Sequence, residues 1–530
     1  MARSQTAQTL LEQILPRACL FRHPVGYLVD KHSACQILSK YSLGPHFSML
    51  TSYPSPLSAL AFELTTREFP LSNPLEAFRN AADRDDLFWL DTASPVEHGA
   101  WSYLGTKPVE CLQIDGDSMF HTTYRSDGAP TVASISPIQL LRRLQPRPLS
   151  RAGRPEGPPF CGGWVGFWGY SGQKSSRNLP RLSLGYFDTI LAFSHEEQRW
   201  WGAATLQDAL TDDGKKREAR HKISRLIEQF ASPPKARPLS EGRTECRRIK
   251  TNCPRDAYLA SVRRALEYIG AGDIYQINLA QQFTVPWAES SAALYLRMRQ
   301  ESPSAHGAFL GPGLVGQQQG LCSISPELFL RKRGRSVLTR PIKGTRPRGQ
   351  TPQDTIAARH ALESSVKERA ELNMIVDLER NDLGRVCEPG SIEVLSAGKI
   401  EELPTLLHRV ATVRGRLRPG LSPLRLLAAT FPGGSITGAP KIRAMQIIDE
   451  LEPAPRGPYC GAIGWMGLDG DLELSIAIRT ALHDGAHGLA HYWAGSGIVA
   501  DSDPLQEYEE TLHKATAFFR ATNAQGSPEF

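Results

Sequence analysis

One lysine stands in a backbone setting that could direct its side chain into a pocket. Lys343 lies before a glycine in the run PIKGTRPR (residues 341–348), which follows an apolar, strand-like segment ending at Leu338. Desolvation in a pocket lowers the pKa of an amine and frees it as a nucleophile. Taken alone, a solvated surface lysine is the simpler interpretation, so the rest of the sequence has to decide between the two.

Two pairs of glutamates are spaced for metal binding. Glu368 and Glu371 lie three residues apart in a predicted helix, and Glu507 and Glu510 repeat that spacing in a second one. Side chains three apart share one helix face, so each pair by itself fits a solvated, salt-bridged surface. If the two pairs face each other, their carboxylates could hold Mg²⁺, which takes one or two carboxylates and leaves positions for substrate oxygens.

Two glycine-rich segments and one arginine could bind anions. Residues 431–441 (FPGGSITGAPK) offer backbone N–H groups and a helix start at Pro440, although the lysine does not follow the second glycine as a phosphate loop requires. Residues 494–498 (AGSGI) offer further donors at a predicted strand end. Arg479, at the end of a predicted strand over 472–479, could clamp a carboxylate or be an ordinary surface residue.

A mixed scaffold of helices and strands has to position these residues. The sequence predicts helices over 215–230, 255–271 and 352–383, the last capped by Thr351 with Pro352 in its first turn. Strands are predicted at 281–285, 328–331, 463–466, 472–479 and 491–494. Because the two kinds of element do not alternate regularly, we expect an α+β fold with antiparallel sheets instead of a doubly wound parallel sheet.

The composition is that of a soluble globular protein. Of the 530 residues, 41% are hydrophobic and 22% charged, with a net charge of +6. No basic run alternates with aromatic residues and no apolar run reaches membrane-spanning length, so we expect neither a nucleic acid nor a membrane partner. Nine scattered cysteines without a C-x-x-C pair predict reduced thiols and a cytoplasmic location. The first 25 residues leave a short transit peptide open.

Six motifs together resemble the chorismate-binding family of enzymes. They are PIKGTRP (341–347), ELNMIVDLERNDLGRV (371–386), FPGGSITGAPK (431–441), RGPYCGAIGW (456–465), AIRT (477–480) and AGSGIVADSDPLQEYEETLHKA (494–515). PFCGGWVGFWGY (159–170) resembles the amino-terminal region of its amine-transferring members more loosely. The resemblance implies two large antiparallel sheets packed as a sandwich with helices on the outside. The resemblance covers a catalytic domain (252–518), and the composition and strand pattern of the remaining residues predict a sheet-rich region (1–231), a linker (232–251) and a flexible tail (519–530).

The residue at position 343 separates members of that family. A lysine there is the pattern of aminodeoxychorismate synthase component I, whereas other members usually have alanine. Gln276 stands where isochorismate and salicylate synthases carry a water-activating lysine, and residues 47–52 lack the tryptophan-sensing L-L-E-S motif of anthranilate synthases. The resemblance therefore implies formation of 4-amino-4-deoxychorismate for 4-aminobenzoate and folate biosynthesis. Anthranilate synthase component I and an inactive regulatory homologue are the alternatives.

The resemblance also implies a covalent mechanism. Lys343 would attack C2 of chorismate while Glu327 protonates the departing C4 hydroxyl, close to His408. Ammonia would then add at C4 and expel the lysine. The chain has no G-x-C-x-G glutaminase turn, so ammonia would come from a partner glutamine amidotransferase subunit.

Further residues acquire binding roles from the same resemblance. Mg²⁺ would sit on Glu371 and Glu510, and its waters would be oriented by Glu368 and Glu507. Substrate contacts would come from Gly344, Thr345, Tyr459, Arg479, Gly495, Gly497 and Lys514.

Overall fold

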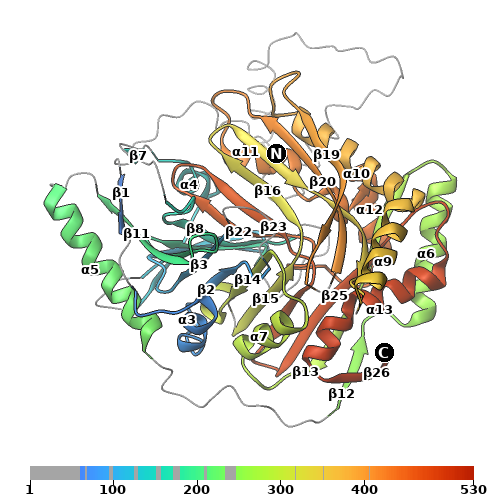
Figure 1. Ribbon diagram of the computed structural model, residues 1–530, viewed down its shortest axis with the longest axis horizontal. Coiled ribbons are helices and arrows are strands. Elements are labelled where there is room, and N and C mark those ends of the chain that lie inside the picture. The colour runs from blue at the N-terminus through green and yellow to red at the C-terminus, as the bar shows by residue number, and fades with distance from the viewer. Residues whose placement is uncertain are drawn as a thin grey trace, which may run out of the picture. The chain divides into compact units, whose positions relative to one another are not determined.

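The strands of the protein form two large sheets that lie against each other, with helices around them (Figure 1). The computed structural model describes residues 60–65, 69–94, 100–124, 129–147, 149–150, 157–170, 180–207, 212–232, 246–316, 318–349, 351–404 and 406–529. The predictions on the first 25 residues and on residues 47–52 lie outside these ranges. Within them, neighbouring strands are antiparallel except for the pairs β1–β7 (Leu60–Thr65 with Leu149–Ser150) and β12–β26 (Arg247–Thr251 with Ala524–Glu529).

The larger sheet has 14 strands in the described residues. From one edge to the other the order is β26, β12, β13 (Gln276–Pro286), β25 (Leu489–Ile498), β24 (Thr480–Asp484), β15 (Gln319–Ser325), β14 (His306–Leu310), β2 (Phe88–Asp91), β3 (Trp101–Gly105), β10 (Thr189–Ser194), β11 (Arg199–Gln207), β1 and β7, with β21 (Gly438–Ala439) paired to β13.

The smaller sheet has 12 strands in the same ranges. Its order is β18 (Ile342–Pro347), β20 (Leu406–Arg416), β17 (Ser336–Arg340), β16 (Leu328–Arg333), β23 (Leu472–Ile476), β22 (Ala462–Gly467), β8 (Gly163–Trp168), β9 (Leu182–Phe187), β4 (Glu110–Asp115), β5 (Ser118–Thr123) and β6 (Thr131–Ser134), with β19 (Glu393–Glu402) paired to β20. Both sheets therefore contain strands from before and after the predicted linker.

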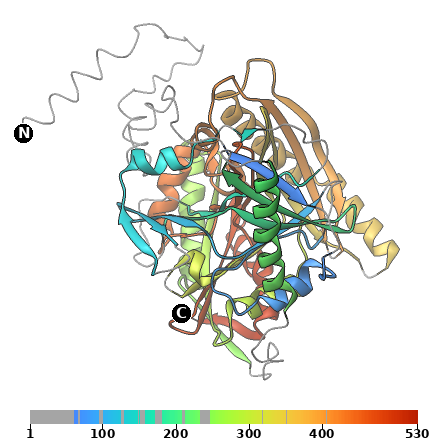
Figure 2. The same ribbon diagram turned by 90° about the vertical axis from the view of Figure 1, so that its left-hand side faces the viewer.

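The helices connect strands and cover the sheets. They are α3 (Pro74–Asn80), α4 (Pro137–Arg143), α5 (Asp212–Ala231), α6 (Arg255–Gly270), α7 (Ser291–Glu301), α8 (Pro312–Val315), α9 (Pro352–Ser364), α10 (Val366–Gly384), α11 (Pro423–Thr430), the 3₁₀ turn η2 (Gly434–Ile436), α12 (Lys441–Leu451) and α13 (Pro504–Ala521). Figure 2 shows α5 lying across the strands of the larger sheet, where it contacts β10 and β11.

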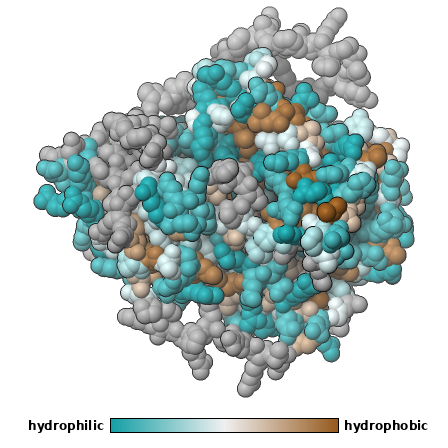
Figure 3. Space-filling view, in the orientation of Figure 1, coloured by the Kyte–Doolittle hydropathy of each residue, from teal (hydrophilic) through white to brown (hydrophobic). Residues whose placement is uncertain are grey.

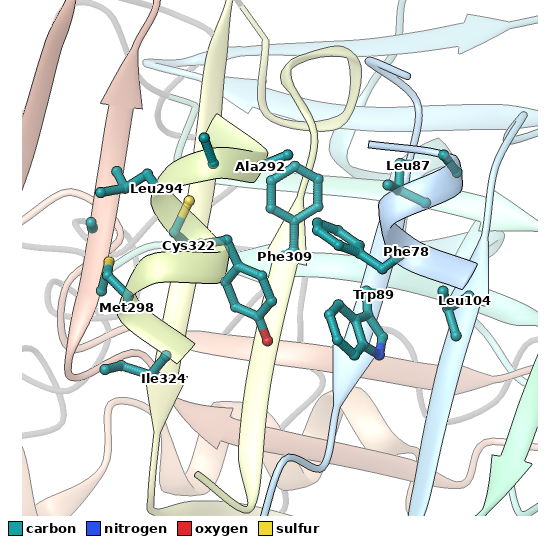
Figure 4. Packing of buried hydrophobic residues seen from close by; sticks show 14 of the residues in the cluster. Phe78, Leu87, Trp89, Leu104, Ala292, Leu294, Met298, Phe309, Cys322 and Ile324 are labelled. Atoms are coloured by element: carbon teal, nitrogen blue, oxygen red, sulfur yellow. The ribbon is translucent and has the colours of Figure 1, made fainter. Parts of the chain in front are cut away.

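Aromatic side chains fill the interior on both faces of the larger sheet. Between the sheets, the ring of Phe88 on β2 lies 4.5 Å from that of Phe187 on β9. On the helix-covered side, Phe78 of α3 packs 4.7 Å from Trp89 and 5.0 Å from Phe309 (Figure 4). Large buried aromatic surfaces of this kind contribute heavily to core stability. Here they pack one face of the larger sheet against the smaller sheet and the other face against helices.

The exposed face in Figure 3 is mainly hydrophilic, and its apolar side chains form small separate groups. In the described residues, no helix is long and apolar enough to cross a membrane.

The predicted helix over 352–383 is in fact two helices. Thr351 caps the start of α9 as predicted, with Pro352 in the first turn, and Asp354 completes a capping box with it. Ser365 then adopts an extended conformation, and its hydroxyl accepts a hydrogen bond from the N–H of Glu368. This second cap ends α9 and begins α10, because a serine side chain satisfies the free N–H groups of a new first turn.

Three other segments differ from the predictions. The strand predicted over 472–479 ends at Ile476, and Arg479 has a left-handed backbone with φ = 49°. The predicted linker ends in β12, and the predicted tail contains the end of α13 and β26. β12 and β26 pair with each other, so each strand provides hydrogen-bond partners for the backbone of the other. The local sequence of neither segment indicates this pairing.

Candidate functional site

A β-bulge turns the side chain of Lys343 into the protein. Along β18, Ile342 pairs with Val410 of β20, but Thr345 pairs with His408, so β18 carries one extra residue. A bulge redirects the side chains around it. Gly344 has φ = +82°, and a Cβ added there would lie 2.8 Å from Leu362. Glycine is therefore required beside the lysine, both by the backbone and by the lack of space.

The Lys343 amine reaches the larger sheet. A Cβ built on Gly497 of β25 would lie 3.3 Å from Lys343 Nζ, although the lysine is attached to the edge strand of the smaller sheet. Burial lowers the pKa of Lys343, and Lys514 acts in the same direction, against Glu371, Glu327 and Glu510. The net lowered pKa favours the neutral, nucleophilic amine.

Glu327 lies between β15 and β16 and is 3% exposed. Its Oε1 accepts a 2.6 Å hydrogen bond from the Ser435 hydroxyl. Burial raises the pKa of Glu327 to about 7, although the Ser435 hydrogen bond and Lys343 oppose the rise. A carboxyl group with this pKa is protonated in a useful fraction near neutral pH, as a general acid must be.

Ser435 was not among the residues singled out in the sequence, and the glycine-rich segment around it differs from the predicted anion site. The N–H of Gly434 donates to Glu379 Oε1 at 3.1 Å, so this donor is already occupied by a carboxylate of the chain. Lys441 forms an ion pair with buried Asp382. The segment thus holds Ser435 against Glu327 by internal contacts. Because a serine between a glycine and an isoleucine is unremarkable, its residue type and spacing gave no signal.

Thr345 of β18 and His408 of β20 form a hydrogen-bonded pair, of which the histidine is buried. Thr345 Oγ1 and His408 Nδ1 share a hydrogen bond of 2.8 Å, and His408 is 2% exposed. Burial lowers the pKa of His408 to about 3, and the charge of Arg479 adds to the effect. His408 Nε2 has no hydrogen-bond partner in the described part of the chain. The imidazole is therefore neutral and has one ring nitrogen available.

Arg479 interacts electrostatically with Glu327 and His408, and Tyr459 lies beside Gly495. Burial lowers the pKa of Arg479, while Tyr492 and Glu327 act against it. Tyr459 is 4% exposed, and its ring lies 6.4 Å from that of Trp493 at an angle of 9°. Its hydroxyl is 2.9 Å from the position that a Cβ on Gly495 would occupy. Glycine at this position of β25 therefore leaves room between the strand and the tyrosine.

The four predicted metal ligands come from two helices. Burial raises the pKa of Glu371 on α10, and Glu510 and Glu507 of α13 add to the rise, against Lys343 and Lys367. The α10 and α13 carboxylates are thus close enough to repel one another. Neighbouring carboxylates that repel are the arrangement a divalent cation stabilises.

Each of the other glutamates has a partner within the chain. Glu368 Oε1 lies 2.7 Å from Arg346 Nη1, but its buried Oε2 has no partner in the described ranges. Glu507 accepts hydrogen bonds from Ser496 and Ser502 and is 3% exposed. Glu510 lies 2.7 Å from Lys514 Nζ.

The carboxylates do not form a closed metal cage. Within the described residues, no three acidic, histidine or cysteine side chains gather as a metal cluster. One or two of the carboxylates could still bind a cation that fills its remaining positions with water and ligand oxygens, as Mg²⁺ does.

The structure thus brings the predicted residues into one region from segments far apart in the sequence. Lys514 links the groups, because its amine also donates to the carbonyl of Gly495 at 2.8 Å. The assembly combines a shielded amine, a carboxyl group with a raised pKa, a neutral imidazole, cations and two carboxylate pairs. Such a set can bind a dianion, attack it with an amine and protonate a leaving hydroxyl.

Comparison with known proteins identifies relatives of the whole arrangement. Over residues 88–520 the chain matches the family described as chorismate binding enzyme. It is 36% identical over 469 residues to anthranilate synthase component 1 of Streptomyces coelicolor, which covers 85% of this chain and 86% of the relative. It is 37% identical over 382 residues to aminodeoxychorismate synthase component 1 of Bacillus subtilis, covering 69% and 78%.

A solved structure has the same architecture. Anthranilate synthase component I from Streptococcus pneumoniae superposes with a TM-score of 0.65 at 27% identity, covering 86% of this chain and 99% of that one. Other curated relatives, from Thermus thermophilus and Geobacillus stearothermophilus, are also named anthranilate synthase component 1.

Proposed function

The chain belongs to the family of chorismate-binding enzymes, and on that premise we propose that it is an aminodeoxychorismate synthase component I, which transfers ammonia to C4 of chorismate. The observation that carries the proposal is the Lys343 amine. It is turned inward by a bulge, its pKa is lowered by burial, and it lies close enough to Glu327 to interact with it electrostatically. A lysine that only contributed charge would gain nothing from a lowered pKa.

In the first half-reaction the neutral Lys343 amine attacks C2 of chorismate. The ring double bonds shift, the C4–O bond breaks, and the proton of Glu327 leaves with the hydroxyl as water. Hydroxide is a poor leaving group, so this proton transfer is needed. The new secondary ammonium keeps its proton, which makes it a leaving group. In the second half-reaction ammonia adds at C4, the double bonds shift back, and the bond from C2 to the lysine nitrogen breaks, which releases the neutral Lys343 amine. The ammonium group at C4 then gives a proton to the Glu327 carboxylate and restores the acid.

The surrounding residues bind and orient the dianionic substrate. Arg479 and Tyr459 hold the side-chain carboxylate with the backbone of Gly495 and Gly497, because a planar guanidinium and a fixed hydroxyl define its direction. Gly344 and Thr345 line the ring, and Thr345 fixes the His408 imidazole through their 2.8 Å hydrogen bond. His408 then lies beside the departing C4 hydroxyl.

Mg²⁺ would be held by Glu371 and Glu510, with Glu368 and Glu507 orienting its waters. When bound, the cation neutralises the ring carboxylate and withdraws electron density from the ring. Lys514, 2.7 Å from Glu510, adds positive charge on the same side.

Ammonia is supplied by a separate glutamine amidotransferase subunit. The relatives are named as component 1 of their enzymes, which supports a second component. All seven cysteines of the described ranges are free thiols, and six of them are buried. We place the protein in the cytoplasm, where thiols stay reduced.

Anthranilate synthase component I is the second candidate, because the names of the similar proteins favour it. In that reaction ammonia adds at C2 and pyruvate is lost, so Lys343 would have no covalent role. Both candidates use the same substrate and cation, and the product separates them.

Incubation of the purified chain with chorismate, Mg²⁺ and ammonium decides between the candidates. We expect 4-amino-4-deoxychorismate in the mass spectrum and no fluorescent anthranilate. Lys343→Ala should lower turnover on the order of 10³-fold or more, since a nucleophile is removed, whereas the exposed control Lys399→Ala should not. Without ammonia, the wild-type chain should gain the mass of chorismate minus water. Anthranilate formation that survives Lys343→Ala would refute the covalent proposal, and no turnover at all would indicate an inactive homologue.

A further inference from the structure

Asn278 on β13 has a buried amide that the proposed mechanism does not use. The residue is 6% exposed, and its Nδ2 has no hydrogen-bond partner within the described part of the chain. A buried donor without a partner costs free energy, and native proteins rarely keep one without a reason. A missing ligand at this position is one such reason.

The backbone of Asn278 is held on both sides. Its N–H donates to the carbonyl of Thr437 at 2.8 Å, and its carbonyl accepts from Arg456 Nη2 at 2.7 Å. Arg456 is itself fixed by an ion pair of 2.6 Å with Glu452. The side chain is therefore presented by a rigid backbone, which is how proteins preorganise a binding group.

The amide lies close to a glycine of the neighbouring strand β25. A Cβ built on Gly495 would lie 2.9 Å from Asn278 Nδ2, from the Tyr459 hydroxyl and from the carbonyl oxygen of Leu279, so the amide and the hydroxyl lie beside the same glycine. Any other residue at 495 would collide with both groups. Beside this glycine lie two side-chain donors, the hydroxyl and the amide N–H, and one backbone carbonyl oxygen, while the Lys514 amine is bound to the Gly495 carbonyl. The two donors suit an anionic oxygen that approaches from the side of the tyrosine.

We propose that Asn278 is a further substrate-binding residue, whose amide N–H donates to the side-chain carboxylate of chorismate beside Tyr459. The inference rests on the proposed function, because the substrate is assigned there. It adds a specific donor from β13 to the contacts made by β25 and Arg479. In the free protein this donor is unpaired, and the bound carboxylate satisfies it.

Two unreactive probes test which carboxylate Asn278 binds. 3-(Carboxymethoxy)benzoate carries both a ring and a side-chain carboxylate, whereas 3-methoxybenzoate carries only the first. Asn278→Ala should weaken the dicarboxylate about 10-fold, as expected for a hydrogen bond to a charged group, and leave the monocarboxylate unchanged. Asn278→Asp should weaken the dicarboxylate further by charge repulsion. Equal losses for both probes would overturn the assignment to the side chain.

A matched asparagine separates binding from folding. Asn252 Oδ1 accepts a hydrogen bond of 2.8 Å from the N–H of Gln282, also on β13. Asn252→Ala should therefore lower the thermal midpoint and leave probe binding unchanged. Asn278→Ala should weaken probe binding and leave the thermal midpoint unchanged, because removing an unpaired buried donor does not destabilise the free protein. A lowered midpoint with unchanged affinity would show that Asn278 is structural and overturn the inference.

Steady-state kinetics distinguish a failure here from a failure of the proposed function. For Asn278→Ala we expect KM for chorismate to rise about 10-fold with little change in kcat, since uniform binding is lost. If the wild-type chain turns over chorismate and the variant has an unchanged KM, this inference is overturned and the proposed function stands. A wild-type chain that consumes no chorismate overturns both.

Discussion

Replacing Glu327 by glutamine should stabilise the protein at alkaline pH. The residue is 3% exposed, and burial raises the pKa of its carboxyl group from an ordinary 4.5 to about 7. Between these values the folded protein keeps a proton that the unfolded chain has released. The stability of the wild-type protein therefore falls as the pH rises from 4.5 to about 7, and below 4.5 this contribution is fully present.

The size of the effect follows from the two pKa values. One pKa unit corresponds to about 1.36 kcal/mol, so the free energy of unfolding should lose about 2–3 kcal/mol between pH 5 and pH 8 through Glu327. Glutamine has the same shape and cannot ionise, and its amide oxygen still accepts the Ser435 hydroxyl. Relative to the wild type, Glu327→Gln should therefore gain about 2–3 kcal/mol over this range.

Urea unfolding of both proteins at pH 5 and pH 8 measures this difference. The pKa of Glu379 is also raised to about 7 by burial, but this residue titrates in both proteins and cancels in the comparison. Glu509→Gln, at an exposed position of α13, controls for the amide substitution. The same Glu327 variant should lose turnover by about 10²–10⁴-fold, as expected for a general acid. A stability difference that is equal at the two pH values would refute the reasoning.

Two further substitutions probe the groups around Lys343 and Glu327. Ser435→Ala removes the hydrogen bond that lowers the pKa of Glu327, so the alkaline limb of kcat/KM should move to higher pH by about one unit; a limb that stays in place would contradict the assignment of Glu327 as the acid. Gly497→Ala places a Cβ 3.3 Å from Lys343 Nζ, and displacement of the amine should lower kcat/KM on the order of 10-fold or more. Gly270→Ala is its control, because a Cβ there meets nothing within 4 Å, and equal activity of the two variants would contradict this placement of Lys343.

Features of the fold could be predicted where they depend on interactions between residues close together in the sequence. The cap by Thr351 and the helical spacing of Glu507 and Glu510 depend on residues within one or two turns, and both are present. The break at Ser365 was missed although it is also local, because a serine inside a helical pattern does not by itself indicate a cap. The strand β26 was missed for a different reason, since its hydrogen bonds come from β12, far away in the sequence.

The order of residues specifies which chemical groups are present and which motifs surround them. It indicated the amine, the carboxylate pairs, the arginine and the resemblance that relates them to one another. The direction in which Lys343 points could not be predicted in this way, because it depends on the β18–β20 register and on the glycines of β25. The raised pKa of Glu327, the neutral His408 and the unpaired amide of Asn278 likewise follow from burial. Desolvation and Coulomb interactions depend on distances through space, which the order of residues does not contain.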